Sequence, residues 1–127
     1  MCFACGPKNT RGLHLQFDLD RNRRRLRTRW TPAKECQGYR DIVHGGMISL
    51  VLDELMVNLL WTLHMPAVTA TLNIRLRRPA RVGEALDCEA WIKEESGRFF
   101  LMESHAQNAE GEIVATATAQ CVRRERE

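Results

Sequence analysis

Residues 43–64 of the chain read VHGGMISLVLDELMVNLLWTLH, and this stretch decides the fold. Two adjacent glycines precede an apolar run that is too long for one strand, and Pro66 follows it. Because proline cannot continue a helix, the pattern predicts a single helix from about Gly45 to His64. Apolar residues occur on nearly every side of that helix, so we expect other elements to bury it on most sides.

Outside this segment apolar and polar residues alternate, which is typical of half-buried strands. Before the helix we expect two strands joined by a turn at residues 20–22, the first with its apolar residues at positions 13, 15, 17 and 19 and the second around residues 26–30. After it we expect four strands, around residues 68–77, 86–93, 99–107 and 113–121, with turns at 96–97 and 110–111. This order predicts an α+β fold in which a mostly antiparallel, curved β-sheet wraps around one long central α-helix.

Composition sets limits on the class of protein. The 127 residues are enough for one domain, which we expect to span residues 1–127 with a leader loop at 1–12. Lys and Arg number 19 against 16 Asp and Glu, and the two signs are interspersed. This distribution favours a small anionic ligand and no nucleic acid. The longest apolar run carries two acids in its middle, so no membrane span is expected.

The five cysteines are an odd number, and no signal peptide precedes them, which indicates a reducing, cytoplasmic environment. Cys2 and Cys5 form a C-x-x-C pair, but a second pair at the spacing of a zinc site is missing from the sequence. His14 is the one other nearby residue that could join them as a ligand. We therefore expect no metal site.

Two features of the predicted helix indicate chemistry. Gly45 and Gly46 leave backbone N–H groups accessible at the helix start, where the helix dipole favours an anion or an oxyanion. Asp53 and Glu54 place two carboxylates in a helix that should be buried, where an unpaired charge is costly. A functional role explains that cost. The alternative is that an acid points outward or pairs with arginine, and that His44 only anchors the loop.

The spacing between these features is informative. Gly46 and Asp53 lie seven residues apart, which is about two helical turns and roughly 10 Å along the axis. A general base must lie within hydrogen-bond reach of the water it activates. A carbonyl held by the Gly46 N–H is too far from Asp53 of the same chain. If both groups act on one carbonyl, they come from two chains, which predicts a symmetric homodimer with two shared sites.

The sequence also carries several short motifs. They are an aspartate nine residues after the His of His-Gly-Gly, CFACGPKN at residues 2–9 with Gly12-Leu13, QGY at 37–39, and RRP at 77–79 followed by VGE at 82–84. In these motifs the chain resembles the hotdog-fold acyl-CoA thioesterases of the phenylacetate-pathway (PaaI-like) type. The resemblance implies a hotdog fold, hydrolysis of an acyl-CoA or related thioester, and neither a metal nor an organic cofactor. The predicted homodimer either stays a dimer or pairs with a second one into a homotetramer, and the sequence leaves both open.

The resemblance assigns roles by position. The N–H of Gly45 or Gly46, next to His44, polarises the thioester carbonyl. Asp53 of the partner subunit acts as general base or nucleophile, and Thr69 positions the water. Further candidates for substrate contact are Glu54, the apolar residues Leu50, Met56 and Val57, and the arginines Arg75, Arg77, Arg78 and Arg23–Arg25 for the phosphates of coenzyme A. Some family members carry Asn six residues before the His, where this chain has Gly38.

Two other functions stay open on the sequence alone. One is a non-catalytic acyl-CoA binding or regulatory protein on the same fold, although such regulators carry a DNA-binding segment that the short leader does not accommodate. The other is a hydroxyacyl-thioester dehydratase, whose signature the sequence does not contain. The identity of the acyl chain, and the choice between coenzyme A and a carrier protein, are not encoded in any recognisable motif.

Overall fold

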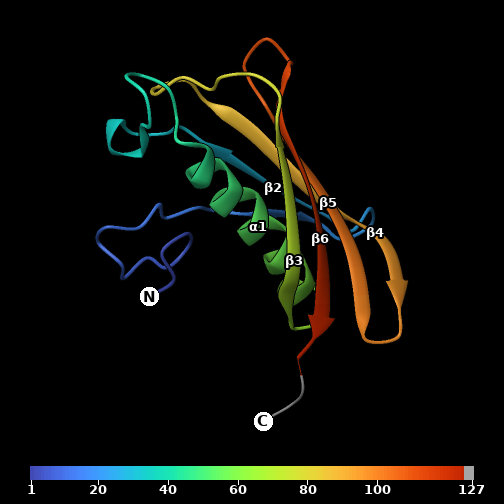
Figure 1. Ribbon diagram of the computed structural model, residues 1–127. Coiled ribbons are helices and arrows are strands. Elements are labelled where there is room, and N and C mark those ends of the chain that lie inside the picture. Colours follow the sequence, from blue (N-terminus) through green and yellow to red (C-terminus); the bar gives the residue numbers. More distant parts are fainter. Residues whose placement is uncertain (125–127) are drawn as a thin grey trace.

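A computed structural model describes residues 1–124 of the protein. The elements are β1 (Asp18–Asp20), β2 (Arg25–Trp30), a short 3-10 helix η1 (Lys34–Cys36), α1 (Gly45–Thr62), β3 (Ala67–Leu76), β4 (Leu86–Ser96), β5 (Phe99–Gln107) and β6 (Ile113–Arg123). The strands form an antiparallel sheet in the order β1-β2-β4-β5-β6-β3, which curves around α1 (Figure 1). The predicted α+β architecture is therefore confirmed.

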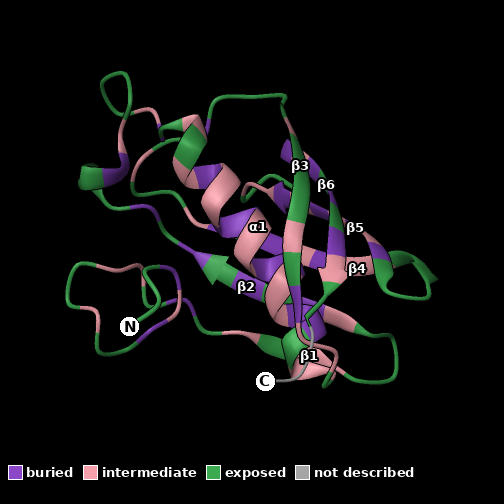
Figure 2. Cartoon of the chain, turned by 60° about the horizontal axis from the view of Figure 1, so that its bottom comes forward, coloured by how far each residue is buried: buried purple, intermediate pink, exposed green. Residues whose placement is uncertain are grey.

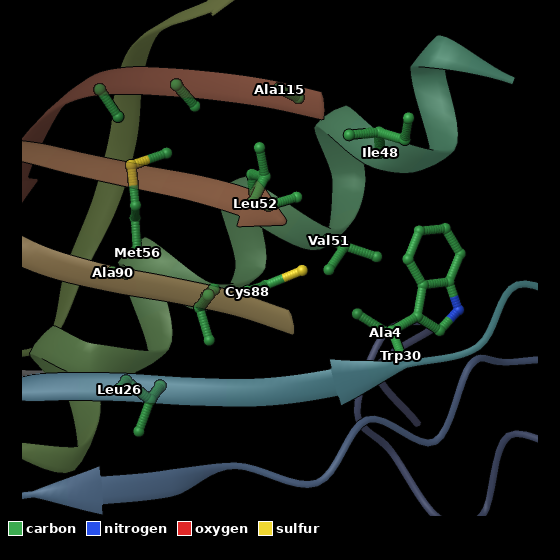
Figure 3. Packing of buried hydrophobic residues seen from close by; sticks show 14 of the residues in the cluster. Ala4, Leu26, Trp30, Ile48, Val51, Leu52, Met56, Cys88, Ala90 and Ala115 are labelled. Carbon is green, nitrogen blue, oxygen red and sulfur yellow. The ribbon is translucent and has the colours of Figure 1, made fainter. Parts of the chain in front are cut away.

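The core lies between α1 and the concave side of the sheet. Ala115, Ala117 and Ala119 of β6 are buried there, and their small side chains let the helix approach the sheet closely. Leu52 and Met56 of α1 are fully buried against this side, as Figure 3 shows at close range. The alternation along β6 thus gives a buried face of small residues.

The helix is less enclosed than its composition predicts. The sheet covers one side, and the opposite side carries half-exposed apolar residues (Figure 2). Leu50 and Val57 are half-buried on this outer side, and Trp61 is 44% exposed. By length and mean hydropathy alone α1 also meets the criterion for a membrane span, a criterion that core helices meet as well. In this fold α1 packs along the sheet and leaves an apolar stripe without cover.

The first predicted strand is wrong over residues 13–17. His14 adopts a left-handed backbone conformation with φ of 53°, which interrupts an extended strand. The N–H groups of Leu13 and Leu15 bind the carbonyls of Phe3 and Ala4 in the leader instead of a neighbouring strand. Only the last three residues of the stretch pair with β2. Residues 13–17 therefore hold the leader loop in place.

A bulge changes which side chains of β3 face the helix. The register with β6 shifts between Thr69 and Thr71. Leu72 lies opposite buried Ala119, and Thr69 lies opposite buried Cys121, so both point to the helix side of the sheet. An uninterrupted alternation would place these two residues on opposite faces, as the sequence pattern predicts. The bulge therefore directs the Thr69 hydroxyl toward α1.

Candidate functional site

The start of α1 has one accessible N–H group. His44 is the N-cap residue, and its Nδ1 accepts a hydrogen bond from the Gly46 N–H at 2.8 Å. Its carbonyl accepts from the N–H groups of Met47 and Ile48. Among the residues that the structure describes, the Gly45 N–H is then the one donor of the first turn that has no acceptor. Of the two glycines singled out in the sequence, Gly45 is the one with a donor available for an oxyanion.

A cavity of about 360 Å³ adjoins this donor. It is lined by Gly38, Tyr39, Ile42, Val43, His44 and Gly45. A Cβ atom on Gly45 would lie 2.6 Å from Cδ1 of Leu76, so the glycine keeps β3 and the helix start in close contact. Sequence reasoning missed Tyr39 and Ile42 as lining residues. The available signal was their position in the loop directly before the His-Gly-Gly motif.

The carboxylate of Asp53 lies on the flank of α1 that faces β3. Thr69 donates a hydrogen bond to Asp53 through its hydroxyl, with 2.7 Å between Oγ1 and Oδ1. Burial raises the pKa of Asp53 above its ordinary value, the Thr69 hydrogen bond partly opposes this, and the neighbouring charge of Glu54 adds to the rise. A fixed, half-buried carboxylate with a raised pKa is suited to accept a proton from water.

The donor and the carboxylate do not meet within one chain. Gly45 and Asp53 are eight residues apart in α1, which corresponds to about 12 Å along the helix axis. Asp53 contacts Thr69 near the start of β3, whereas Gly45 lies against Leu76 at the end of that strand. The two halves of the candidate site are therefore at two separate places along the same helix and strand.

The other residues predicted for substrate contact are dispersed. The Glu54 side chain points to the leader and not to Thr69, and its Oε1 accepts from the thiols of Cys2 and Cys5. Leu50 is half-buried on the outer stripe of α1, but Met56 is fully buried and belongs to the core.

The candidate arginines fall into two groups. Arg75 and Arg77 flank Leu76 at the end of β3 that lies against the helix start. Within residues 1–124, neither of them forms an ion pair. Three others bind acidic side chains of the sheet and its turns: Arg78 pairs with Glu112, Arg24 with Glu95 and Arg25 with Glu89. Arg23 lies in the turn after β1, where its backbone N–H binds Asp20. Arg75 and Arg77 thus keep their charges available near the end of β3, although Arg75 points to the opposite face of the sheet from Leu76.

Comparison with known proteins places this chain in a family. A family model described as the thioesterase superfamily matches residues 41–115, which is more than half of the chain. A sequence search of curated proteins found no match.

Three solved structures show the same fold. The thioesterase superfamily protein RHA08564 superposes with a TM-score of 0.88 at 23% identity, over 94% of this chain and 61% of that one. The E. coli PaaI protein of the phenylacetic acid degradation operon gives 0.80 at 16% identity, over 89% and 81%. A hypothetical thioesterase from Streptococcus pneumoniae TIGR4, crystallised with coenzyme A, gives 0.82 at 16% identity, over 89% and 90%.

This chain spans 61% of the length of RHA08564 and most of the length of the other two. These superpositions confirm the hotdog fold and the resemblance to PaaI-like proteins that the sequence motifs indicate. Together with the matched family model, they show that the chain belongs to the thioesterase superfamily.

Proposed function

We propose that the protein hydrolyses acyl-CoA thioesters at sites shared by two subunits. The Gly45 N–H of one subunit polarises the thioester carbonyl, and Asp53 of the other acts as general base on water or as nucleophile. The observation that carries this proposal is the single accessible donor at the helix start, about 12 Å from a carboxylate that Thr69 holds on the same helix.

The two groups match the demands of the reaction. Attack on a thioester carbonyl places negative charge on its oxygen, and one preorganised N–H donor stabilises such a charge by about 2.7–4 kcal/mol. A positioned general base contributes about 10²–10⁴-fold in rate. The hydrogen bond from Thr69 fixes the Asp53 carboxylate, so that its second oxygen is free to face water. Both elements of thioester hydrolysis are thus available once two chains combine.

The edge of the sheet supports a second copy as the partner. β3 is the last strand in the sheet order, and its outer edge is unpaired in the single chain. Leu72 and Leu76 point to the helix side of the sheet, yet they are 41% and 55% exposed. A long, apolar, unpaired edge is a template for pairing with another strand. Antiparallel pairing of β3 with its copy continues the sheet and covers these residues.

The position of the two-fold axis follows from two contacts. Thr69 lies against Asp53 and Leu76 lies against Gly45. Because the bulge makes residues 70 and 71 share one pairing position, the point midway between these contacts falls at Asn73 of β3. An axis through that point places Thr69 opposite Leu76 of the partner subunit. The partner's Gly45 then lies beside Asp53. The distance between Gly45 and Asp53 along α1 is too long for the two groups to act together within one chain. In a dimer of this register, the same distance brings Gly45 of each subunit next to Asp53 of the other.

Two features of solved relatives support the substrate class and the residue pair. The S. pneumoniae protein was crystallised with coenzyme A, whose phosphates suit the exposed Arg75 and Arg77 here. Variants of that protein were also solved in which an aspartate, or a threonine sixteen residues further on, is replaced by alanine. Asp53 and Thr69 have the same separation.

A panel of acyl-CoA esters with detection of the released thiol tests the proposal. We expect hydrolysis by the native protein, and a loss of about 10²–10⁴-fold for Asp53→Asn with retained binding of the acyl-CoA. Asn keeps an oxygen that accepts from Thr69, so the variant should fold. Asp18→Asn, at an exposed position in β1, is the matched control. Binding of acyl-CoA by the native protein without any hydrolysis would instead support a non-catalytic binding protein.

A further inference from the structure

The leader loop brings two thiols to the back of the helix. Cys2 and Cys5 lie with Glu54 of α1 in one group. The leader that carries the two cysteines, the blue start of the chain in Figure 1, runs on the side of α1 away from β3. The Sγ atoms are 3.5 Å and 3.2 Å from Oε1 of Glu54. Three potential ligand atoms from residues about fifty positions apart thus converge at one point.

Backbone hydrogen bonds in the leader hold Cys2 and Cys5 in place next to Glu54. The N–H of Gly6 binds the carbonyl of Cys2 at 2.8 Å, which closes a tight turn around both cysteines. A Cβ atom at Gly6 would lie 2.5 Å from the backbone N of Cys2, so only glycine fits there. The N–H groups of Leu13 and Leu15 then bind the carbonyls of Phe3 and Ala4. These bonds fix the loop on the domain, and the two thiols do not depend on a flexible tail for their position.

The charge at this point is poorly compensated. Glu54 is half-buried, and within residues 1–124 no ion pair involves it. Its hydrogen-bond partners are two thiols, which are weak donors. A half-buried carboxylate with such partners lacks much of the stabilisation that water or a cation would give it. A bound cation would stabilise the negative charge of the Glu54 carboxylate.

We propose that Cys2, Cys5 and Glu54 bind one Zn²⁺ ion, with the fourth coordination position occupied by water. In a tetrahedral zinc site, bond lengths of about 2.3 Å to sulfur and 2.0 Å to oxygen set the S···O separations at about 3.5 Å. The separations of 3.5 Å and 3.2 Å are already close to this value, and all three ligand atoms lie within 4.8 Å of one another. Thiolate ligands favour Zn²⁺ over Mg²⁺ or Ca²⁺. On binding, each thiol releases its proton to solvent and forms an S–Zn bond.

The third ligand of the proposed site is Glu54 and not His14, the additional ligand considered from the sequence. His14 binds the carbonyl of Asn9 through Nε2 and is not part of the group. Glu54 takes this position because it is turned about 100° around the helix axis from Asp53, toward the leader. The ion therefore stands apart from the Asp53–Thr69 pair, and we assign it a structural role, which is to fix the leader to α1. This inference does not depend on the proposed thioesterase activity.

Metal titration of the reduced full-length protein tests the site. With a non-thiol reductant, we expect one Zn²⁺ per chain, and Co²⁺ in its place should give the charge-transfer absorption of thiolate ligands. Cys5→Ser and Glu54→Gln should each weaken Zn²⁺ binding at least about tenfold. Cys88→Ala and Glu110→Gln are matched controls, because both residues lie outside the group, and they should bind Zn²⁺ like the native protein.

Limited proteolysis provides a second readout. Zn²⁺ should protect the leader of the native protein from cleavage, and it should give no protection to Glu54→Gln. Folded, reduced protein that takes up no Zn²⁺ at micromolar concentration would overturn the proposal. So would Zn²⁺ binding that survives the double change Cys2→Ser and Cys5→Ser, or a Co²⁺ complex without thiolate absorption.

Discussion

Replacing Gly45 with proline removes one hydrogen-bond donor and little else. Gly45 is the first residue of α1, where proline is well accepted because that N–H has no partner within the helix. The preceding residue, His44, has φ of −60° and ψ of 131°, which is the conformation that proline requires before it. The new Cβ meets Cδ1 at the far end of the Leu76 side chain, which is flexible and can shift. Gly45→Ala introduces the same Cβ but keeps the N–H, and is the matched control.

The size of the effect follows from the role of the donor. Loss of one oxyanion donor lowers kcat by about 10²–10³-fold, or about 2.7–4 kcal/mol. Since the Gly45 N–H has no acceptor among the described residues, Gly45→Pro should leave the thermal unfolding midpoint close to that of Gly45→Ala. The assay is kcat and KM for acyl-CoA hydrolysis by thiol release. Equal kcat values for the proline and alanine variants would refute the assignment of Gly45 as the oxyanion donor.

Three further predictions test other parts of the structure. Thr69→Val removes the hydroxyl that holds Asp53, and it should lower kcat about ten- to a hundredfold with KM unchanged. The reason is the loss of a hydrogen bond to a charged group, which is worth about 1.5–3 kcal/mol. An unchanged kcat would contradict this role of Thr69. Leu72→Lys places a charge on the exposed edge strand and should convert dimers to monomers in sedimentation analysis. The control Thr118→Lys on β6 should remain dimeric. A stable Leu72→Lys dimer would exclude the β3 interface. Burial opposes ionisation of Glu89, but hydrogen bonds from its two arginine partners outweigh burial and lower its pKa below the ordinary 4.5. The ionised Glu89 therefore contributes fully to stability above pH 4.5, and this contribution is lost as the pH falls through the lowered pKa. The unfolding midpoint of the native protein should therefore decline below pH 4.5 more steeply than that of Glu89→Gln, and parallel curves would argue against the ion pair.

Local patterns in the sequence predict most of the secondary structure. The alternation in β4, β5 and β6 matches their buried faces except at Val114, which is fully buried next to buried Ala115. The turns expected near Gly97 and Gly111 occur where glycine adopts positive φ. Each of these features depends on neighbouring residues, so the sequence pattern is sufficient. The predicted helix is also correct except that it ends at Thr62 rather than His64, where the backbone turns left-handed before Pro66.

The errors concern features that distant contacts determine. The bulge in β3 arises from its register with β6, so the alternation around Thr69 could not show that its hydroxyl faces α1. The backbone turn at His14 arises from pairing with the leader. In the site, the choice between Gly45 and Gly46 depends on how the His44 imidazole is oriented, and the contact of Glu54 with the leader joins segments far apart in the chain.

A mixing experiment tests the shared site most directly. Gly45→Pro and Asp53→Asn homodimers should each be nearly inactive, because every site lacks either the donor or the base. After subunit exchange in equal amounts, half of the dimers contain one chain of each kind, and each of these has one intact site out of two. A shared site predicts recovery of about one quarter of the native activity. An exchanged mixture as inactive as its parents would show that donor and base act within one chain, and would contradict a site shared by two subunits.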